Sequence, residues 1–330
     1  MMPFLTLRKA VNCHFMRVAI GCFFLYLLPL QSVIAQTSLM ANPQTLKQVQ
    51  QKLKNKHQHS KKTVALYFPP KQFSKSMFEY TQVMLSPEYE LQSYQPDLPD
   101  DTLVIITGYD KAYRFIANKY QHDAIVLGVS SQQQIMLEEA RCIQLKHCAV
   151  WLYLNNQASP LRVKALQEHF FKTKRLGIAT IDWPMLPVWQ KTLPDLSWVE
   201  GSQQDKPFNV MKKSVEEADV FVLLPDRYMI NNTTVRAILQ YLYRQKIPTI
   251  GYSNSSHVAG SLLSSYANYT QSLLSVKYYL SQPQSNWPKS SYVCYQSYYY
   301  NERLARSLGV NISVEKLNQL SEQLDDMCYQ

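Results

Sequence analysis

Short apolar runs alternate with helix-patterned segments along most of this chain, and this alternation constrains the fold more than any other feature. Strands that alternate with helices form parallel sheets. Between Val235 and Tyr243, apolar residues recur at i, i+3, i+4, i+7 and i+8, which predicts a helix with one face packed on such a sheet. The strands are expected at 63–68, 102–107, 124–129, 149–154, 175–180, 219–224 and 249–252.

The length of the chain predicts two lobes, because about 300 residues exceed what one hydrophobic core usually organises. A polar break at 155–160 follows one strand and precedes a helical pattern. We therefore expect an α/β protein with lobe 1 over 63–160 and lobe 2 over 161–285. A C-terminal crossover and tail should follow over 286–330, and the chain should cross between the lobes near its end.

The N-terminal 35 residues have the three parts of a cleavable signal peptide. Arg8, Lys9 and Arg17 form a basic leader, 18–30 is apolar, and small residues precede the expected cleavage after Ala35. The alternative is a membrane anchor, but thirteen apolar residues span only about 20 Å as a helix, short of a ~30 Å hydrocarbon core. These features predict a soluble periplasmic protein.

Net charge falls from +10 to +7 when the leader and its three basic residues are removed. Much of the remaining positive charge lies in the lysine-rich segment 36–62, which is expected to be a solvated N-terminal segment. No basic recognition helix, zinc-finger spacing or RNA-binding aromatic signature is present. Nucleic-acid binding is therefore not expected.

Four cysteines remain after the leader, and an even number in an exported chain suggests disulfides. A bridge between Cys142 and Cys148 would close the loop before a strand, and one between Cys294 and Cys328 would hold the C-terminal tail. Other pairings stay open. A metal site is not expected, because paired C-x-x-C spacing is missing.

Polar loops follow several predicted strands, and in parallel α/β sheets these loops line the ligand crevice. Serine, asparagine and backbone N–H groups at a helix start can hold an anionic group such as a carboxylate. Each residue taken singly could instead do no more than cap its helix. The candidate ligand-binding residues are Gly108, Tyr109, Ser130, Ser131, Asp182, Trp183, Asp226, Asn231 and Asn232.

Enzyme motifs are missing from the sequence. It contains no G-x-S-x-G, H-E-x-x-H, P-loop or G-x-G-x-x-G pattern, and only eight glycines. We expect neither catalysis nor a cofactor. The chain has 23 tyrosines, several of them clustered at 292–300, which suits either core packing or a stacking platform for an aromatic ligand.

Several motifs in the second half resemble those of one family. The segment 218–226 is similar to an "aspartate, apolar strand, P-T-D" pattern, 246–251 to "K-I-P-V-F-G", 258–266 to "V-x-x-G-A-L-A-S-Y" and 300–310 to "I-N-x-x-x-A-x-x-L-G-I". These patterns resemble the periplasmic substrate-binding proteins of ABC transporters with the type 1 periplasmic-binding fold, in the branch of tryptophan and tyrosine binders. The resemblance implies two Rossmann-like lobes joined by three crossovers, which close on a ligand by hinge bending.

The chain departs from this family where the ligand would lie. The family's "G-T-x-A-A" loop is here Gly108-Tyr109-Asp110-Lys111-Ala112, and no threonine precedes Asp226. We therefore expect a monomeric periplasmic binding protein that captures a small ligand, an amino acid or an aromatic compound, for an inner-membrane permease. Asp226 is expected to engage a ligand amino group. The alternative is a sensor or adaptor of the same fold that acts on a membrane signalling protein.

Overall fold

The structure is a computed structural model that describes residues 62–67, 73–86, 88–144, 149–231 and 233–326. The expected signal peptide, the basic segment as far as residue 61, Cys148, Asn232 and Cys328 lie outside these residues. None of the helices in the described ranges is long and apolar enough to cross a membrane.

Lobe 1 is built on a sheet with the strand order β11-β5-β4-β3-β1-β2, in which all neighbours are parallel. Its strands are β1 (Lys62–Tyr67), β2 (Tyr89–Ser93), β3 (Leu103–Thr107), β4 (Ala124–Leu127), β5 (Trp151–Asn155) and β11 (Ser290–Tyr292). Its helices are α3 (Phe73–Leu85), α4 (Tyr109–Ala117), α5 (Ser131–Gln144), α11 (Tyr269–Leu280) and the short η1 (Gln284–Asn286).

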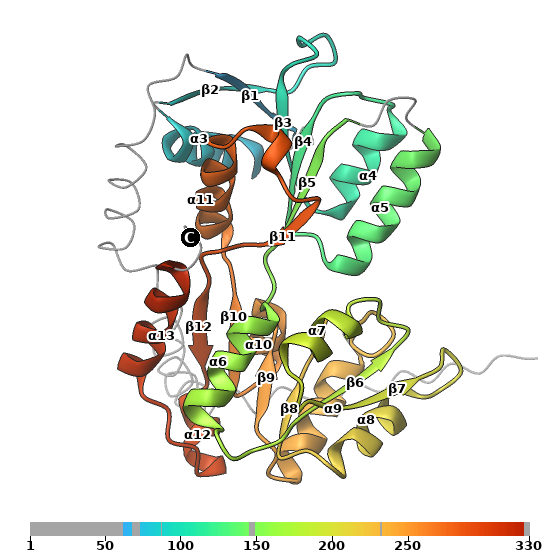
Figure 1. Cartoon of the computed structure of the whole chain (residues 1–330), viewed down its shortest axis with the longest axis vertical. Coiled ribbons are helices and arrows are strands. Elements are labelled where there is room, and N and C mark those ends of the chain that lie inside the picture. Colours follow the sequence, from blue (N-terminus) through green and yellow to red (C-terminus); the bar gives the residue numbers. More distant parts are fainter. Residues whose placement is uncertain (1–61, 68–72, 87, 145–148, 232, 327–330) are drawn as a thin grey trace, which may run out of the picture. The chain divides into compact units, whose positions relative to one another are not determined.

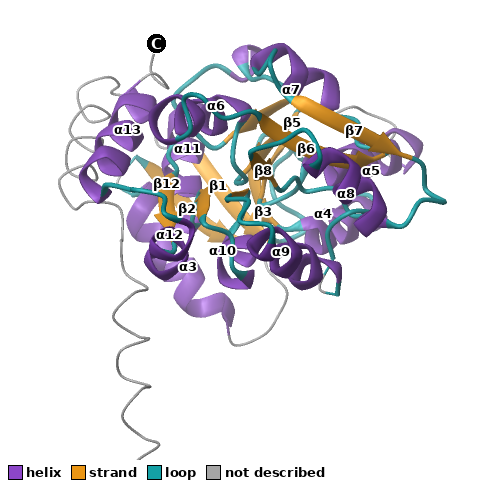
Figure 2. Ribbon diagram, turned by 90° about the horizontal axis from the view of Figure 1, so that it is seen from below, coloured by secondary structure: helices purple, strands orange, loops and turns teal. Residues whose placement is uncertain are grey.

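Alternate residues of the central strands in lobe 1 pack on opposite faces of the sheet. Leu66 and Ile105 belong to a core with α3 and α11, whereas Ala65 and Ile106 belong to a core with α4 and α5. Because both faces are covered, these strands are apolar over most of their length. Helices consequently flank the sheet on both sides (Figures 1 and 2).

Lobe 2 is built on a second sheet with the order β12-β10-β9-β8-β6-β7, in which β12 alone among the described strands is antiparallel to its neighbour. Its strands are β6 (Leu176–Ile181), β7 (Ser197–Gly201), β8 (Val220–Val222), β9 (Thr249–Gly251), β10 (Leu263–Tyr266) and β12 (Ser297–Tyr300). Its helices are α6 (Pro160–Phe170), α7 (Leu186–Thr192), α8 (Pro207–Val215), α9 (Thr234–Arg244), α10 (Asn254–Ala259), α12 (Glu302–Leu308) and α13 (Val314–Asp326).

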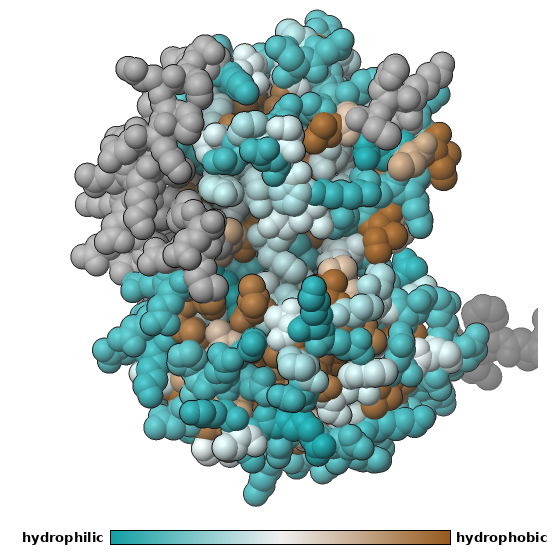
Figure 3. Space-filling model, viewed as in Figure 1, coloured by the Kyte–Doolittle hydropathy of each residue, from teal (hydrophilic) through white to brown (hydrophobic). Residues whose placement is uncertain are grey.

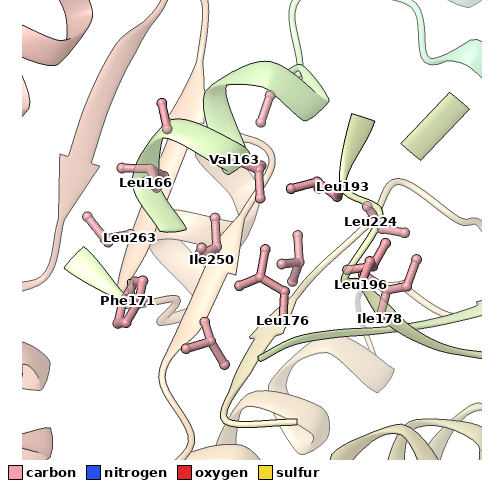
Figure 4. Packing of buried hydrophobic residues seen from close by; sticks show 14 of the residues in the cluster. Val163, Leu166, Phe171, Leu176, Ile178, Leu193, Leu196, Leu224, Ile250 and Leu263 are labelled. Carbon is pink, nitrogen blue, oxygen red and sulfur yellow. The ribbon is translucent and has the colours of Figure 1, made fainter. Parts of the chain in front are cut away.

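Lobe 2 also has a core on each face of its sheet. On one face, Val163 and Leu166 of α6 pack against strand residues such as Ile250 and Leu176 (Figure 4). On the other face, Ala179 and Phe221 pack with residues of α8 and α9. Each lobe thus buries its own apolar core.

Three crossovers join the lobes. The first runs from β5 to α6, the second from β10 to α11, and the third from β11 to β12. They are tied together by backbone hydrogen bonds, from Ala267 N–H to the Asn156 carbonyl and from Val293 N–H to the Asn155 carbonyl, both at 2.8 Å. The predicted fold class, two lobes with parallel sheets and a three-crossover hinge, is confirmed.

The second crossover comes earlier in the chain than the sequence predicts. Lobe 2 was expected to extend to residue 285, yet α11, which begins at Tyr269, packs in the core of lobe 1. Lys277 of α11 also forms an ion pair with Glu88, next to β2. The apolar face of α11 gives no indication of which sheet it covers, which explains the difference.

Candidate functional site

Loops at the carboxyl ends of strands in the two lobes contact each other. The backbone N–H of Arg227, in the loop after β8, donates to Gln132 Oε1 at the start of α5 at 3.3 Å. The Arg227 guanidinium also lies 3.5 Å from Met136 Sδ on α5. We call the residues at these facing strand ends the inter-lobe site.

Arg227 is held in place by its neighbour Tyr228. Its Cζ atom lies 4.8 Å from the centre of the Tyr228 ring, and Nη2 donates to the Tyr228 hydroxyl at 2.8 Å. This stacked arrangement suits the planar guanidinium. Sequence reasoning identified this loop as informative but selected Asp226 in preference to Arg227.

The Asp226 side chain is fully buried. Oδ2 accepts the Ile181 N–H of β6 at 2.5 Å, and Oδ1 accepts the N–H groups of Tyr228 and Met229 at 2.8 and 3.3 Å. Burial raises the pKa of this carboxyl, and the three backbone hydrogen bonds act in the opposite direction. The carboxylate holds the loop against β6, and the expected contact with a ligand amino group stays a prediction.

Asp182 and Trp183 follow β6 directly. Asp182 is exposed, has a positive φ of 54° and accepts a hydrogen bond from Gln203 Nε2 at 2.9 Å. Trp183 is buried and packs edge-to-face on Trp189 of α7, with ring centres 5.8 Å apart. The Trp183 indole Nε1 and the Thr180 hydroxyl are both buried without a hydrogen-bond partner among the described residues.

On the lobe 1 side, Gly108 precedes α4 and has a φ of 87°, a conformation that glycine adopts without strain. A Cβ atom at this position would meet nothing within 4 Å, so the start of α4 borders open space. Tyr109 is half-buried and stacks on Tyr113, with ring centres 6.1 Å apart. Lys111 donates to the Thr107 hydroxyl at 2.8 Å, and burial lowers the pKa of its ammonium group.

Ser130 and Ser131 have different roles. Ser130 caps α5, because its hydroxyl accepts the Gln133 N–H at 3.2 Å while Gln133 Oε1 accepts the Ser130 N–H at 2.9 Å. Ser131 is buried and accepts a hydrogen bond from Asn155 Nδ2 at 3.3 Å. The capping alternative therefore applies to Ser130, and Ser131 belongs to a buried polar group.

Tyr292 lies next to this buried group, although the sequence singled it out only as part of a tyrosine cluster. Burial raises the pKa of its phenol, and the side chains of Trp189 and Ser131 act in the opposite direction. Since Trp189 belongs to lobe 2 and Ser131 to lobe 1, Tyr292 lies near side chains of both lobes. Sequence reasoning missed it because β11 carries no strong strand pattern.

Asn231 is exposed, and its side chain caps the start of α9. Its Oδ1 accepts the N–H groups of Thr233 and Thr234, both at 2.9 Å, which satisfies donors at the helix start. The other predicted asparagine, Asn232, lies outside the described residues.

The cysteines differ in part from the prediction. Cys142 is a free, exposed thiol within α5, so the expected bridge to Cys148 is not formed. The prediction placed Cys142 in a loop, whereas the helix extends to Gln144 and turns this side chain to solvent. Cys294 is not among the free cysteines. Its pairing with Cys328 stays a prediction.

Neither metal ligands nor apolar surface marks an alternative site. Within the described ranges, no group of three or more His, Cys, Asp or Glu side chains could hold a metal ion. In Figure 3 much of the visible described surface is hydrophilic, with separate apolar patches. Apolar residues scattered over a surface are normal in soluble proteins, so the inter-lobe site remains the main candidate.

Similarity to known proteins is found in structure only. No family model matches the chain, and no curated protein matches its sequence. The ligand-free, open structure of a substrate binding protein with adhesive properties from Clostridium difficile matches with a TM-score of 0.50 and 14% identity, over 78% of this chain and 98% of that one.

Two further solved structures match with a TM-score of 0.45. One is a conserved domain protein from Vibrio cholerae, 13% identical over 78% of this chain and 97% of its own. The other is an ABC domain in complex with L-Trp from Streptococcus pneumonia, 10% identical over 79% of this chain and 99% of its own. The match to the Clostridium difficile structure shows that this chain shares the fold of that substrate binding protein.

Proposed function

We propose that this chain is a periplasmic solute-binding protein that captures a small ligand between its two lobes for an ABC-type importer. The observation that carries the proposal is the contact between strand-end loops of two parallel-sheet lobes beside a three-crossover hinge. In α/β proteins such strand ends are where ligands bind. The monomeric protein would present its closed form to an inner-membrane permease.

Buried donors at the end of β6 support a ligand at this place. Most buried polar groups in proteins have a hydrogen-bond partner, so an unpaired one needs an explanation. The Trp183 indole N–H and the Thr180 hydroxyl both lack one among the described residues, and both lie at the carboxyl end of β6. A ligand with hydrogen-bond acceptors and an apolar body, of the size of an amino acid or an aromatic acid, would suit them.

A thermal-shift screen of residues 36–330 against amino acids and aromatic carboxylic acids tests ligand capture. A ligand that binds only the folded state stabilises it by roughly 2.7 kcal/mol at a hundredfold excess over its dissociation constant. The expected result is that one chemical class raises the melting temperature in a concentration-dependent way. Lack of stabilisation by every class in the screen would contradict the proposal.

The inter-lobe position of the ligand is tested with Arg227→Ala. The variant keeps the backbone N–H that donates to Gln132 but removes the guanidinium that lies beside Met136 of α5, and this loss should disfavour the closed form. The dissociation constant of the ligand found in the screen should rise by about 3- to 10-fold, as roughly 1 kcal/mol implies. Arg244→Ala, at the exposed far end of α9, is the matched control. Equal affinities in both variants would place the ligand elsewhere.

A further inference from the structure

Gln296, in the third crossover, connects the first crossover to β10 through its buried side chain. Its Nε2 donates to the Gln157 carbonyl of the first crossover at 2.8 Å. The same nitrogen also donates to the Val293 carbonyl, at 3.1 Å. Its Oε1 accepts from the Ser265 hydroxyl, next to the second crossover, at 3.0 Å. Any bending of the hinge must move groups that this one amide joins.

Arg162 of α6 fixes the backbone of the same crossover to lobe 2. Its guanidinium is buried and donates to the carbonyls of Gln296 and Cys294, at 3.0 and 2.7 Å. The group also lies over the Tyr298 ring, with Cζ 5.7 Å from the ring centre. A planar guanidinium with fixed donor directions holds two carbonyls more rigidly than a flexible ammonium group would.

The C-terminal helix α13 completes this arrangement. Near its end, Asp325 forms an ion pair with Arg162. One turn earlier, the Ser321 hydroxyl donates to the Gln296 carbonyl at 2.7 Å. Leu317 and Leu320 anchor α13 in the core of lobe 2. The third crossover is therefore held by side chains of both α6 and α13.

We propose that α13 is a hinge clamp that limits how far the two lobes can separate. Opening requires backbone rotation in the crossovers. The carbonyls of Cys294 and Gln296 can rotate only if Arg162 and Ser321 release them. Asp325 compensates the buried charge of Arg162 and holds its guanidinium in the orientation that bonds both carbonyls. The inference rests on the proposed function insofar as the lobes move to admit a ligand.

The test measures the separation of the lobes directly, without a ligand. Spin labels are attached to the native exposed Cys142 on α5 of lobe 1 and to Gln240→Cys on the exposed side of α9 in lobe 2, in a Cys148→Ser background. Pulsed electron paramagnetic resonance then gives the distribution of distances between the labels. Asp325→Asn and Ser321→Ala are compared with the parent chain.

Both variants should gain a population at longer distances that the parent chain lacks, and the shift should be larger for Asp325→Asn. Glu322→Gln removes the same charge from an exposed position of α13 and should reproduce the parent distribution. If Asp325→Asn does not fold, the Ser321→Ala distribution alone tests the clamp. A Ser321→Ala distribution identical to that of the parent chain would overturn the clamp. Because no ligand is used, failure of the proposed function would leave this result unaffected.

Discussion

The two carboxylate oxygens of Asp226 accept hydrogen bonds from different elements, one from a strand and the other from a loop. Oδ2 accepts the N–H of Ile181, whereas Oδ1 accepts those of Tyr228 and Met229. An asparagine would turn its amide donors toward one of these N–H groups and leave it unpaired. Asp226→Asn should therefore lower the free energy of unfolding by about 1 to 3 kcal/mol, although it removes a buried charge.

Urea unfolding at neutral pH measures this loss. Asp195→Asn makes the same change at an exposed position of lobe 2 and should leave the free energy of unfolding within about 0.5 kcal/mol of the parent value. An Asp226→Asn variant as stable as the parent would show that the carboxylate does not position the loop.

His257 predicts a pH dependence of stability. Burial lowers the pKa of its imidazole below the usual 6.5, and its Nδ1 has no hydrogen-bond partner among the described residues. As pH falls through 6.5, the unfolded chain takes up a proton that the native imidazole does not, so the free energy of unfolding falls. His257→Phe, which keeps a ring beside Tyr299, should reduce this loss between pH 7.5 and pH 5.5. The urea midpoints of both proteins at the two pH values measure this loss. An equal loss in His257→Phe and in the parent chain would contradict the assignment of the pH dependence to His257.

Residue types alone could not decide between capping and ligand binding. Serine and asparagine before a helix are suited to either role, and the structure shows which groups they bond. Ser130 and Asn231 cap helices, whereas Ser131 bonds the buried Asn155 side chain. Asp226 follows a strand as a ligand-binding residue would, but its burial depends on β6, which lies far away in the sequence. Such long-range partners leave no local pattern.

At the scale of elements, strand prediction succeeded where strands are central. The run expected at 175–180 is β6 (Leu176–Ile181), because strands covered on both faces are continuously apolar. The edge strands β2 and β11 were not predicted. The sequence of β2 is Tyr-Glu-Leu-Gln-Ser, and that of β11 is Ser-Ser-Tyr. Their side chains are partly exposed, so the sequence there carries little apolar signal.

The packing of α8 on β6 depends on Gly177. A Cβ atom there would lie 2.3 Å from the Ala218 Cβ and 3.3 Å from the Ser214 carbonyl oxygen, so the methyl group of alanine does not fit. Gly177→Ala should lower the free energy of unfolding by about 1 to 3 kcal/mol through overpacking. Adding Ala218→Gly removes the closest contact and should recover part of the loss, which a double-mutant cycle in urea measures. Strictly additive effects would contradict this packing account.

For the whole molecule, the sequence predicted two lobes but not how they are coupled. Alternating strands and helices are a local signal, whereas the hydrogen bonds that join the crossovers bring together residues such as Gln157, Ser265 and Gln296, far apart in the chain. Each lobe has its own buried cores, so cooperativity between the lobes must pass through the crossovers and the inter-lobe contacts.

Gln296→Ala should therefore weaken the coupling as well as the stability. It removes the amide that joins the first and third crossovers to β10, and it leaves the Gln157 carbonyl and the Ser265 hydroxyl without this partner, at a cost of about 2 to 4 kcal/mol. Calorimetry should show the transition broaden or split, with the van't Hoff enthalpy falling below the calorimetric enthalpy. Gln323→Ala, exposed on α13, should keep the parent ratio. A single, equally sharp transition in Gln296→Ala would mean that other contacts couple the lobes, among them that of Arg227 with α5 at the inter-lobe site.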